Sequence, residues 1–123
     1  MPRFLLSVHS PASAPSESPM TEEQRRTMMQ RIEQLEARMR AADALVSSVR
    51  LADAGDAVVV DAGASGDGPV VTDGPFLETK ELIAGFYVVE AESSDAAIGW
   101  ATETSKAVGM PIEIRAFLDY RDG

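Results

Sequence analysis

The chain carries one histidine, His9, which is therefore the first candidate for proton transfer. His9 ends the segment 3–9, whose alternating apolar residues predict a strand. Residues two apart share a face of a strand, so Ser7 and His9 should be neighbours. An imidazole titrates near neutral pH and is the side chain used most often as a general acid or base. The structural alternative is that His9 is an ordinary polar residue at the end of a strand.

Asp73 is the second candidate for chemistry, and it precedes Gly74 and Pro75. This order predicts a shaped turn, because glycine permits unusual dihedral angles and proline keeps the preceding residue out of the helical region. Phe76 is expected to anchor that turn in the core. The Asp73 carboxylate either accepts hydrogen bonds within the turn or lies at the rim of a cleft. In the second case it would serve with His9 as a general acid or base.

Ser7 and Arg115 are the candidate substrate-binding residues. Arg115 belongs to the alternating segment 112–118 and could bind an anionic substrate, or it could pair with Glu113 or Glu90. The absence of cysteine excludes disulfides, thiolate metal sites and cysteine nucleophiles. A single histidine excludes a multi-histidine metal site within one chain. We therefore predict no metal and no cofactor.

Acidic residues dominate the second part of the sequence. The formal net charge is −9, and residues 43–123 hold fifteen acidic and five basic residues. Such a body repels phosphate backbones, so nucleic-acid binding is disfavoured. No apolar run is long enough to span a membrane, and no secretory signal precedes residue 20. These features predict a soluble, cytoplasmic protein whose charge serves solubility.

The hydrophobic pattern alternates between strand and helix periods, as expected for one domain over residues 1–123. The helix predicted over 21–43 has a capping box at Thr21 and an apolar stripe that includes Met28 and Met39. Core packing explains this stripe, although its methionines also suit a binding groove. The expected order is strand 3–9, mobile Pro/Ser-rich loop 10–20, helix 21–43, strand 45–51, short strands 57–62 and 69–72 joined by 63–68, strand 83–91, helix 94–108 and strand 112–118.

This order is the split βαβ pattern of a ferredoxin-like α+β sandwich with a β-hairpin insertion. Two helices cover only one face of such a sheet. Leu5, Phe117 and one side of residues 86–91 would leave apolar surface on the other face. We therefore expect a homodimer in which a second copy covers this face.

Residues 70–81 resemble the signature of the YCII-related, or DGPF, family, whose consensus reads D-G-P-F-A-E-T-K-E. Leu77 departs from the usual alanine, and the glycine and aromatic residues at 85–87 resemble the start of the family's next strand. The residues that match the consensus are Asp73, Gly74, Pro75, Phe76, Glu78, Thr79, Lys80 and Glu81.

The resemblance implies a dimeric α/β-barrel fold related to the ferredoxin sandwich, with no established reaction for most members. Related YCII proteins carry a proposed His–Asp pair whose histidine lies on the first helix. The helix predicted here over 21–43 has no histidine, so that pair does not transfer directly. Two functions stay open. One is a cofactor-independent small-molecule enzyme that uses His9 and Asp73 for proton transfer. The other is a non-catalytic module for small-ligand binding or regulatory dimerisation.

Overall fold

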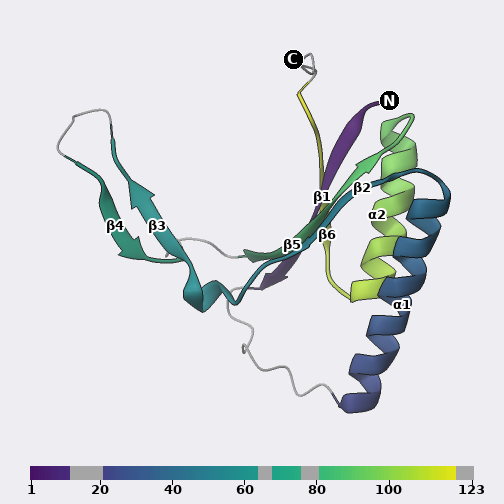
Figure 1. Ribbon diagram of the computed structural model, residues 1–123, viewed down its shortest axis with the longest axis horizontal. Coiled ribbons are helices and arrows are strands. Elements are labelled where there is room, and N and C mark those ends of the chain that lie inside the picture. Colours follow the sequence, from purple (N-terminus) through teal and green to yellow (C-terminus); the bar gives the residue numbers. More distant parts are fainter. Residues whose placement is uncertain (12–20, 64–67, 76–80, 119–123) are drawn as a thin grey trace.

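The computed structural model describes residues 1–11, 21–63, 68–75 and 81–118. Four strands form an antiparallel sheet in the order β2-β5-β1-β6, and β3 and β4 form a separate two-stranded sheet (Figure 1). This arrangement confirms the α+β class. The elements are β1 (Arg3–Pro11), α1 (Glu22–Ala41), β2 (Leu45–Arg50), the short 3-10 helix η1 (Ala54–Asp56), β3 (Val58–Asp61), β4 (Val70–Asp73), β5 (Glu81–Glu90), α2 (Ser94–Val108) and β6 (Ile112–Ala116).

Both long helices have the ends that their sequences predict. The Thr21 hydroxyl accepts a hydrogen bond from the Gln24 N–H, and the Gln24 side chain accepts one from the Thr21 N–H, each at 3.0 Å. Ser93 caps α2 through the N–H of Ala96 at 3.2 Å, and Gly109 ends α2 with a φ of 72°. These contacts satisfy backbone groups that a helix terminus leaves unpaired. Neither helix is long and apolar enough to cross a membrane.

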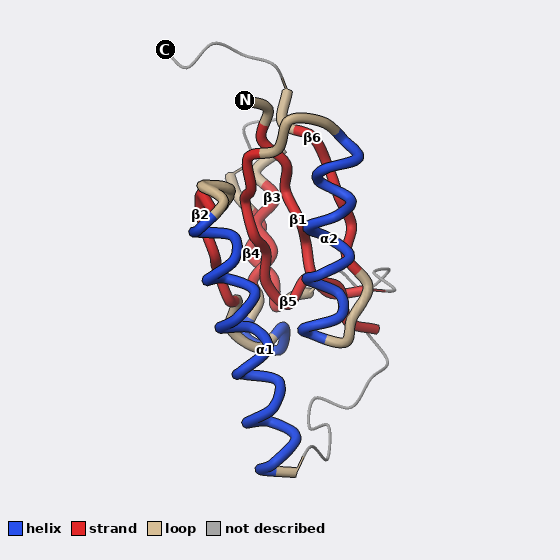
Figure 2. The backbone as a smooth tube through the Cα atoms, turned by 90° about the vertical axis from the view of Figure 1, so that its right-hand side faces the viewer, coloured by secondary structure: helices blue, strands red, loops and turns tan. Residues whose placement is uncertain are grey.

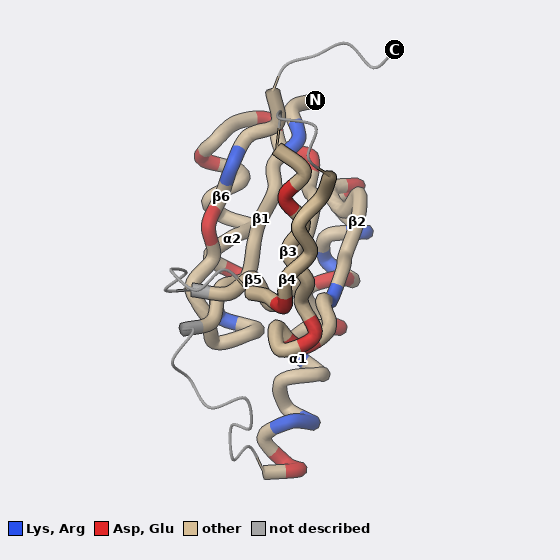
Figure 3. The backbone as a smooth tube through the Cα atoms, turned by 90° about the vertical axis from the view of Figure 1, so that its left-hand side faces the viewer, with Lys and Arg blue, Asp and Glu red and all other residues tan. Residues whose placement is uncertain are grey.

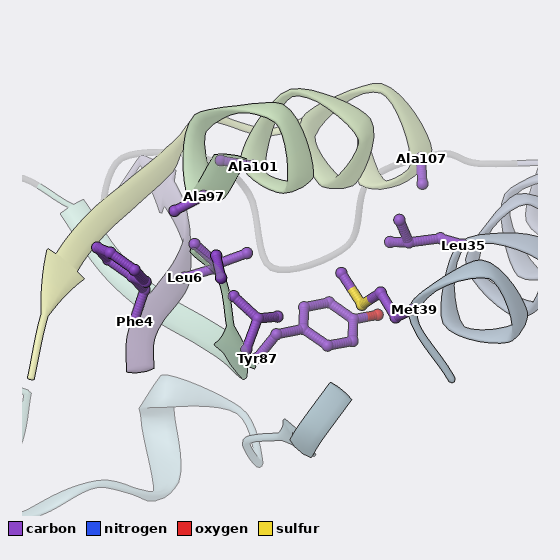
Figure 4. Close-up of a cluster of buried hydrophobic side chains, with 10 residues drawn as sticks. Phe4, Leu6, Leu35, Met39, Tyr87, Ala97, Ala101 and Ala107 are labelled. Carbon is purple, nitrogen blue, oxygen red and sulfur yellow. The ribbon is translucent and has the colours of Figure 1, made fainter. Parts of the chain in front are cut away.

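The core lies between the four-stranded sheet and the two helices, which cover the same face of the sheet (Figure 2). Phe4 and Leu6 of β1 are buried against α2 and α1, and Val89 of β5 lies beside them. Leu35 and Met39 come down from α1, and the ring of Tyr87 points toward that helix (Figure 4). Burial of each large apolar side chain stabilises the fold by about 1.5–3 kcal/mol.

The opposite face of the four-stranded sheet, here called the open face, is not covered by either of the two long helices of the described residues. Leu5 pairs with Val88 of β5 and Ser7 pairs with Phe86, so these four residues share the open face. All but the buried Ser7 are only half-buried. The β3–β4 pair rises on this side of the molecule, in front of the sheet in Figure 3. Its valines Val58, Val60, Val70 and Val71 are all exposed.

The first strand is longer than predicted. Ser10 and Pro11, which the sequence assigned to the loop, pair with Leu82 and Glu81 and so belong to β1. Proline fits here because its fixed φ suits an extended backbone and it stands at the last position of the strand. A register shift between Val8 and His9 interrupts the pairing with β5. Residues 12–20, which complete the predicted loop, lie outside the described part of the chain.

Gly74 lies in a closely packed position and does not have an unusual backbone conformation. It does not adopt a positive φ, and its N–H donates to the carbonyl of Ala57 at 2.7 Å. A Cβ at this position would lie 3.1 Å from Val59 Cγ2 and 3.2 Å from Ala57 Cβ. The turn therefore docks onto the start of β3. The Gly74–Pro75 peptide is cis, and Phe76 lies outside the described residues.

We predict that Leu6→Ala lowers the free energy of unfolding by about 2–5 kcal/mol, because Leu6 is fully buried and the change leaves a cavity. Leu118→Ala is the matched control, since this leucine is 86% exposed and should change stability by less than about 0.5 kcal/mol. Urea unfolding measures both. Equal losses in the two variants would contradict the position of the core.

Candidate functional site

Ser7 and His9 lie side by side on the open face. The Ser7 Oγ is 3.0 Å from the His9 Nε2, and the Ser7 hydroxyl also donates to the carbonyl of Glu113 on β6 at 3.4 Å. When the Ser7 hydroxyl proton points to the Glu113 carbonyl, the Ser7 Oγ can accept a hydrogen bond from a protonated His9 Nε2. The His9 N–H donates to the Pro111 carbonyl at 3.1 Å, so the backbone is held as well. The strand therefore orients the imidazole through the neighbouring serine.

Arg115 lies on the same face of β6 as Glu113, and its Cα pairs with that of Leu5 on β1. The side chain is exposed. The ion pair with Glu90 that the sequence left open does not form. Glu90 instead lies 3.4 Å from the Nε of Arg3. Ser7, His9 and Arg115 thus share one face of the sheet, on adjacent strands.

Asp73 lies on a different sheet from His9. It is the last residue of β4, it pairs with Val58 of β3, and it is exposed. Directly opposed residues share a face, so Asp73 stands on the same side of the two-stranded sheet as Val58, Val60 and Val71. No group in residues 1–11, 21–63, 68–75 and 81–118 donates a hydrogen bond to its carboxylate. Hydrogen bonding within the turn, one of the two roles that the sequence left open for this carboxylate, is therefore not formed with these residues.

A cavity lies elsewhere, beneath the first turns of α1 on the helix side of the sheet. Its volume is about 700 Å³. We call it the α1 cavity, and neither His9 nor Asp73 is among the residues that line it. These residues are Val8, Arg25, Met28, Met29, Ile32, Glu33, Glu36, Ser48, Val49, Arg50, Leu51, Ala84, Gly85, Phe86, Tyr87, Val108 and Met110.

Gly85 lines the α1 cavity at the point where β2 and β5 come closest together. Val8, Gly85 and Arg50 pair across three adjacent strands and form one row on the helix side of the sheet. A Cβ on Gly85 would lie 2.6 Å from the carbonyl oxygen of Val49, so the close approach of β2 requires glycine there. The first turns of α1 extend past the end of the sheet (Figures 1 and 2).

One end of the α1 cavity is a polar cluster centred on Glu36. The Tyr87 hydroxyl donates to Glu36 Oε2 at 2.9 Å, and the Ser48 hydroxyl reaches the same oxygen at 3.4 Å. Arg40 contacts the other carboxylate oxygen at 3.4 Å. Burial, followed by the hydrogen bond and the negative charge of Glu36, raises the pKa of Tyr87 to about 12. The phenol therefore stays neutral and acts as a donor near neutral pH.

The other end of the α1 cavity carries Arg25 and Arg50. The Arg50 Nη2 lies 3.3 Å from the sulfur of Met29, a weak acceptor. No carboxylate among the described residues forms an ion pair with either arginine. The α1 cavity thus has a mostly apolar wall, with Glu36 and its hydrogen-bond partners at one end and the guanidinium groups of Arg25 and Arg50 at the other.

Sequence reasoning assigned Met28 to the core and did not find this cavity. The structure leaves Met28 half-buried at the cavity wall, while Leu35 and Met39 of the same stripe are fully buried. The methionines of the stripe were a signal for the cavity, because they also suited a binding groove.

The protein belongs to the α+β class. Two helices cover one face of an antiparallel sheet, and the α1 cavity lies under the first helix. The family model of the YCII-related domain matches residues 1–115. The chain therefore belongs to the YCII-related family. It is also 39% identical over 56 residues to an uncharacterised protein of Rhizobium meliloti (strain 1021). That alignment covers 44% of this chain and 45% of the relative, so the chain matches less than half of that protein.

We predict that the raised pKa of Tyr87 makes the protein lose stability as the pH rises from about 10 to about 12. The unfolded state releases the phenolic proton first, near 10.0, and the folded state releases it last, so alkali favours unfolding in this window. Urea unfolding at several pH values should show a shallower loss in Tyr87→Phe than in the unmodified protein. Equal slopes would contradict the burial of this phenol.

The phenolate absorbance tests the cause of the shift. The sequence holds two tyrosines, so a Tyr120→Phe background reports Tyr87 alone. Glu36→Gln should then lower the pKa of Tyr87 while leaving it above 10.0, because burial is the larger cause.

Proposed function

We propose that this protein binds a small organic molecule in the α1 cavity. The observation that carries the proposal is the cavity itself, whose volume of about 700 Å³ lies within the range of small-molecule sites. Such sites have a mainly apolar lining with a few fixed polar groups. The α1 cavity has this character, with apolar residues from α1, β2, β5 and α2 and the anchored Glu36–Tyr87 pair at one end.

The walls of the α1 cavity are suited to an adaptable fit. Met28, Met29 and Met110 all contribute to the lining. Methionine is unbranched and polarisable, so it can adjust to differently shaped apolar ligands. The floor at Gly85 is fixed by its close contact with β2, so the adjustable part of the site is the helix side.

We predict that Met28→Trp reduces the affinity for any bound compound by about tenfold, because the larger ring occupies space that the ligand requires. A thermal-shift screen of small organic molecules on the unmodified protein identifies the compounds. Gln30→Trp is the matched control, since it places the same side chain on the exposed side of α1. Compounds that stabilise both variants equally would show that the α1 cavity is not the site.

We also propose that the protein is a cytoplasmic homodimer of the ferredoxin-like, dimeric α/β-barrel type, with the β3–β4 pair as the inserted hairpin. The strand order β2-β5-β1-β6 and the DGPF-type segment support this arrangement. The open face offers Leu5, Phe86 and Val88 to a partner. A twofold contact between two such faces would remove this apolar surface from water.

We predict that Val88→Glu weakens the dimer by at least about tenfold, because it places a charge at the centre of the contact. Ile98→Glu is the control, since Ile98 is 51% exposed on α2 and lies away from the open face. Sedimentation at micromolar concentration measures both variants. A stable monomer of the unmodified protein would end the proposal.

A second candidate function is proton transfer on a small molecule bound at the open face. It rests on the contact of 3.0 Å between Ser7 and His9, which orients the imidazole. Here His9 would be the general acid or base, Asp73 its partner in catalysis, and Ser7 and Arg115 would bind the substrate. The exposed Asp73 carboxylate accepts no hydrogen bond from the described residues, so Asp73→Ala should change stability by only about 0.5 kcal/mol.

The two candidates are separated by product formation. Compounds from the thermal-shift screen are incubated with the protein and followed by NMR. Catalysis at the open face requires turnover that His9→Gln and Asp73→Ala abolish without a change in melting temperature. Binding without turnover, lost in Met28→Trp, supports the α1 cavity as a binding site alone.

A further inference from the structure

We infer that the ligand of the α1 cavity is an amphipathic anion, with a carboxylate or similar group held by Arg50 and Arg25 and an apolar body along α1. This inference rests on the proposed binding function and names the chemical class of its ligand. It starts from the two guanidinium groups, which line the cavity and have no carboxylate partner among the described residues.

The acidic residues of the α1 cavity do not neutralise these arginines. Glu36 is engaged by Tyr87, Ser48 and Arg40, at 2.9, 3.4 and 3.4 Å. Glu33, Arg25 and Arg50 are all exposed, so water screens the three charges to a similar degree. The lining holds two arginines and two glutamates, and Glu36 is already paired with Arg40 from outside the lining. Among the described residues, two guanidinium groups without an ion pair therefore stand against the one remaining carboxylate, that of Glu33.

The guanidinium of Arg50 is placed to act on a ligand inside the cavity. Arg50 shares its row of the sheet with Gly85, and its Nη2 contacts Met29 on the helix opposite. The thioether is a poor partner for a cation, so a ligand oxygen would gain a charge-assisted hydrogen bond at little cost. Arg25 lies one helical turn before Met28 and Met29, on the same cavity wall.

The apolar body of the ligand would lie between the two polar ends. Met28, Ile32 and Val108 form the wall from the helices, and Val8 and Gly85 form the floor. Glu36 and Tyr87 close the inner end, where the carboxylate repels an anion and so directs the ligand's charged group toward Arg50. The geometry therefore sets the orientation of the ligand as well as its charge.

The test uses decanoate and its neutral isostere decanamide as probes, at concentrations below their aggregation. Calorimetry should show decanoate binding to the unmodified protein about tenfold more tightly than decanamide, as expected for a charge-assisted bond. Shortening the chain to octanoate should weaken binding by roughly tenfold, because two methylene groups leave the apolar wall. Arg50→Gln should weaken decanoate about tenfold and leave decanamide unchanged.

Arg26→Gln is the matched control, because it removes the same charge from an exposed residue of α1 that does not line the cavity. Equal binding of the two probes, or equal effects of Arg26→Gln and Arg50→Gln, would overturn the anionic class and leave the binding site standing. Decanoate binding that survives Met28→Trp would show that the probe lies outside the α1 cavity. That result would overturn both this inference and the proposed function.

Discussion

Two helices must cover one face of a four-stranded sheet, and they do not cover all of it equally. α2 lies over β1 and β6, while α1 continues past the end of the sheet (Figures 1 and 2). Where α1 lies over strands, Leu35 and Met39 are fully buried. Nearer its N-terminal end, Met28 and Ile32 of α1 are only half-buried and line the α1 cavity together with residues of β1, β2 and β5. The open face is the other consequence of the same limit, because both long helices of the described residues lie on the opposite side of the sheet.

Strand β5 joins these two regions, because its alternate residues face opposite sides of the sheet. Gly85 and Tyr87 form part of the α1 cavity, and Phe86 and Val88 lie in rows of the open face. The contact of Gly85 with the Val49 carbonyl draws β2 close to β5 at this point. A larger residue at position 85 would therefore disturb the floor of the cavity and the pairing of the edge strand together.

Much of the fold followed from the sequence because periodicity and helix caps are local signals. Thr21 marked the start of α1 correctly, and Ser93 and Gly109 cap the two ends of α2. β1 lies in the middle of the sheet, since β5 and β6 both pair with it. The end of β1 was wrong by two residues, because the strand potential of Ser10 and Pro11 depends on pairing with β5.

The sites were less predictable, because they depend on which elements meet. Ser7 and His9 could be placed together, since strand alternation puts them on one face. The relation of Asp73 to His9 required knowing that β3 and β4 form a sheet of their own. The α1 cavity required the register that aligns Val8, Gly85 and Arg50 beneath α1. The relation of Asp73 to His9 and the row of residues beneath α1 both depend on strand pairing, which no local pattern encodes.

The Glu36–Tyr87 contact shows why the α1 cavity can hold a charge gradient without losing stability. Partial loss of hydration is costly for a carboxylate unless its oxygens accept hydrogen bonds, and the Glu36 side chain is 19% exposed. Here a phenol, a serine hydroxyl and a guanidinium satisfy Glu36 from three directions. Its negative charge stays fixed at the inner end, and the arginines stay uncommitted at the outer end. The field along the cavity is therefore built from the protein's own groups before any ligand enters, which lowers the cost of orienting a polar ligand.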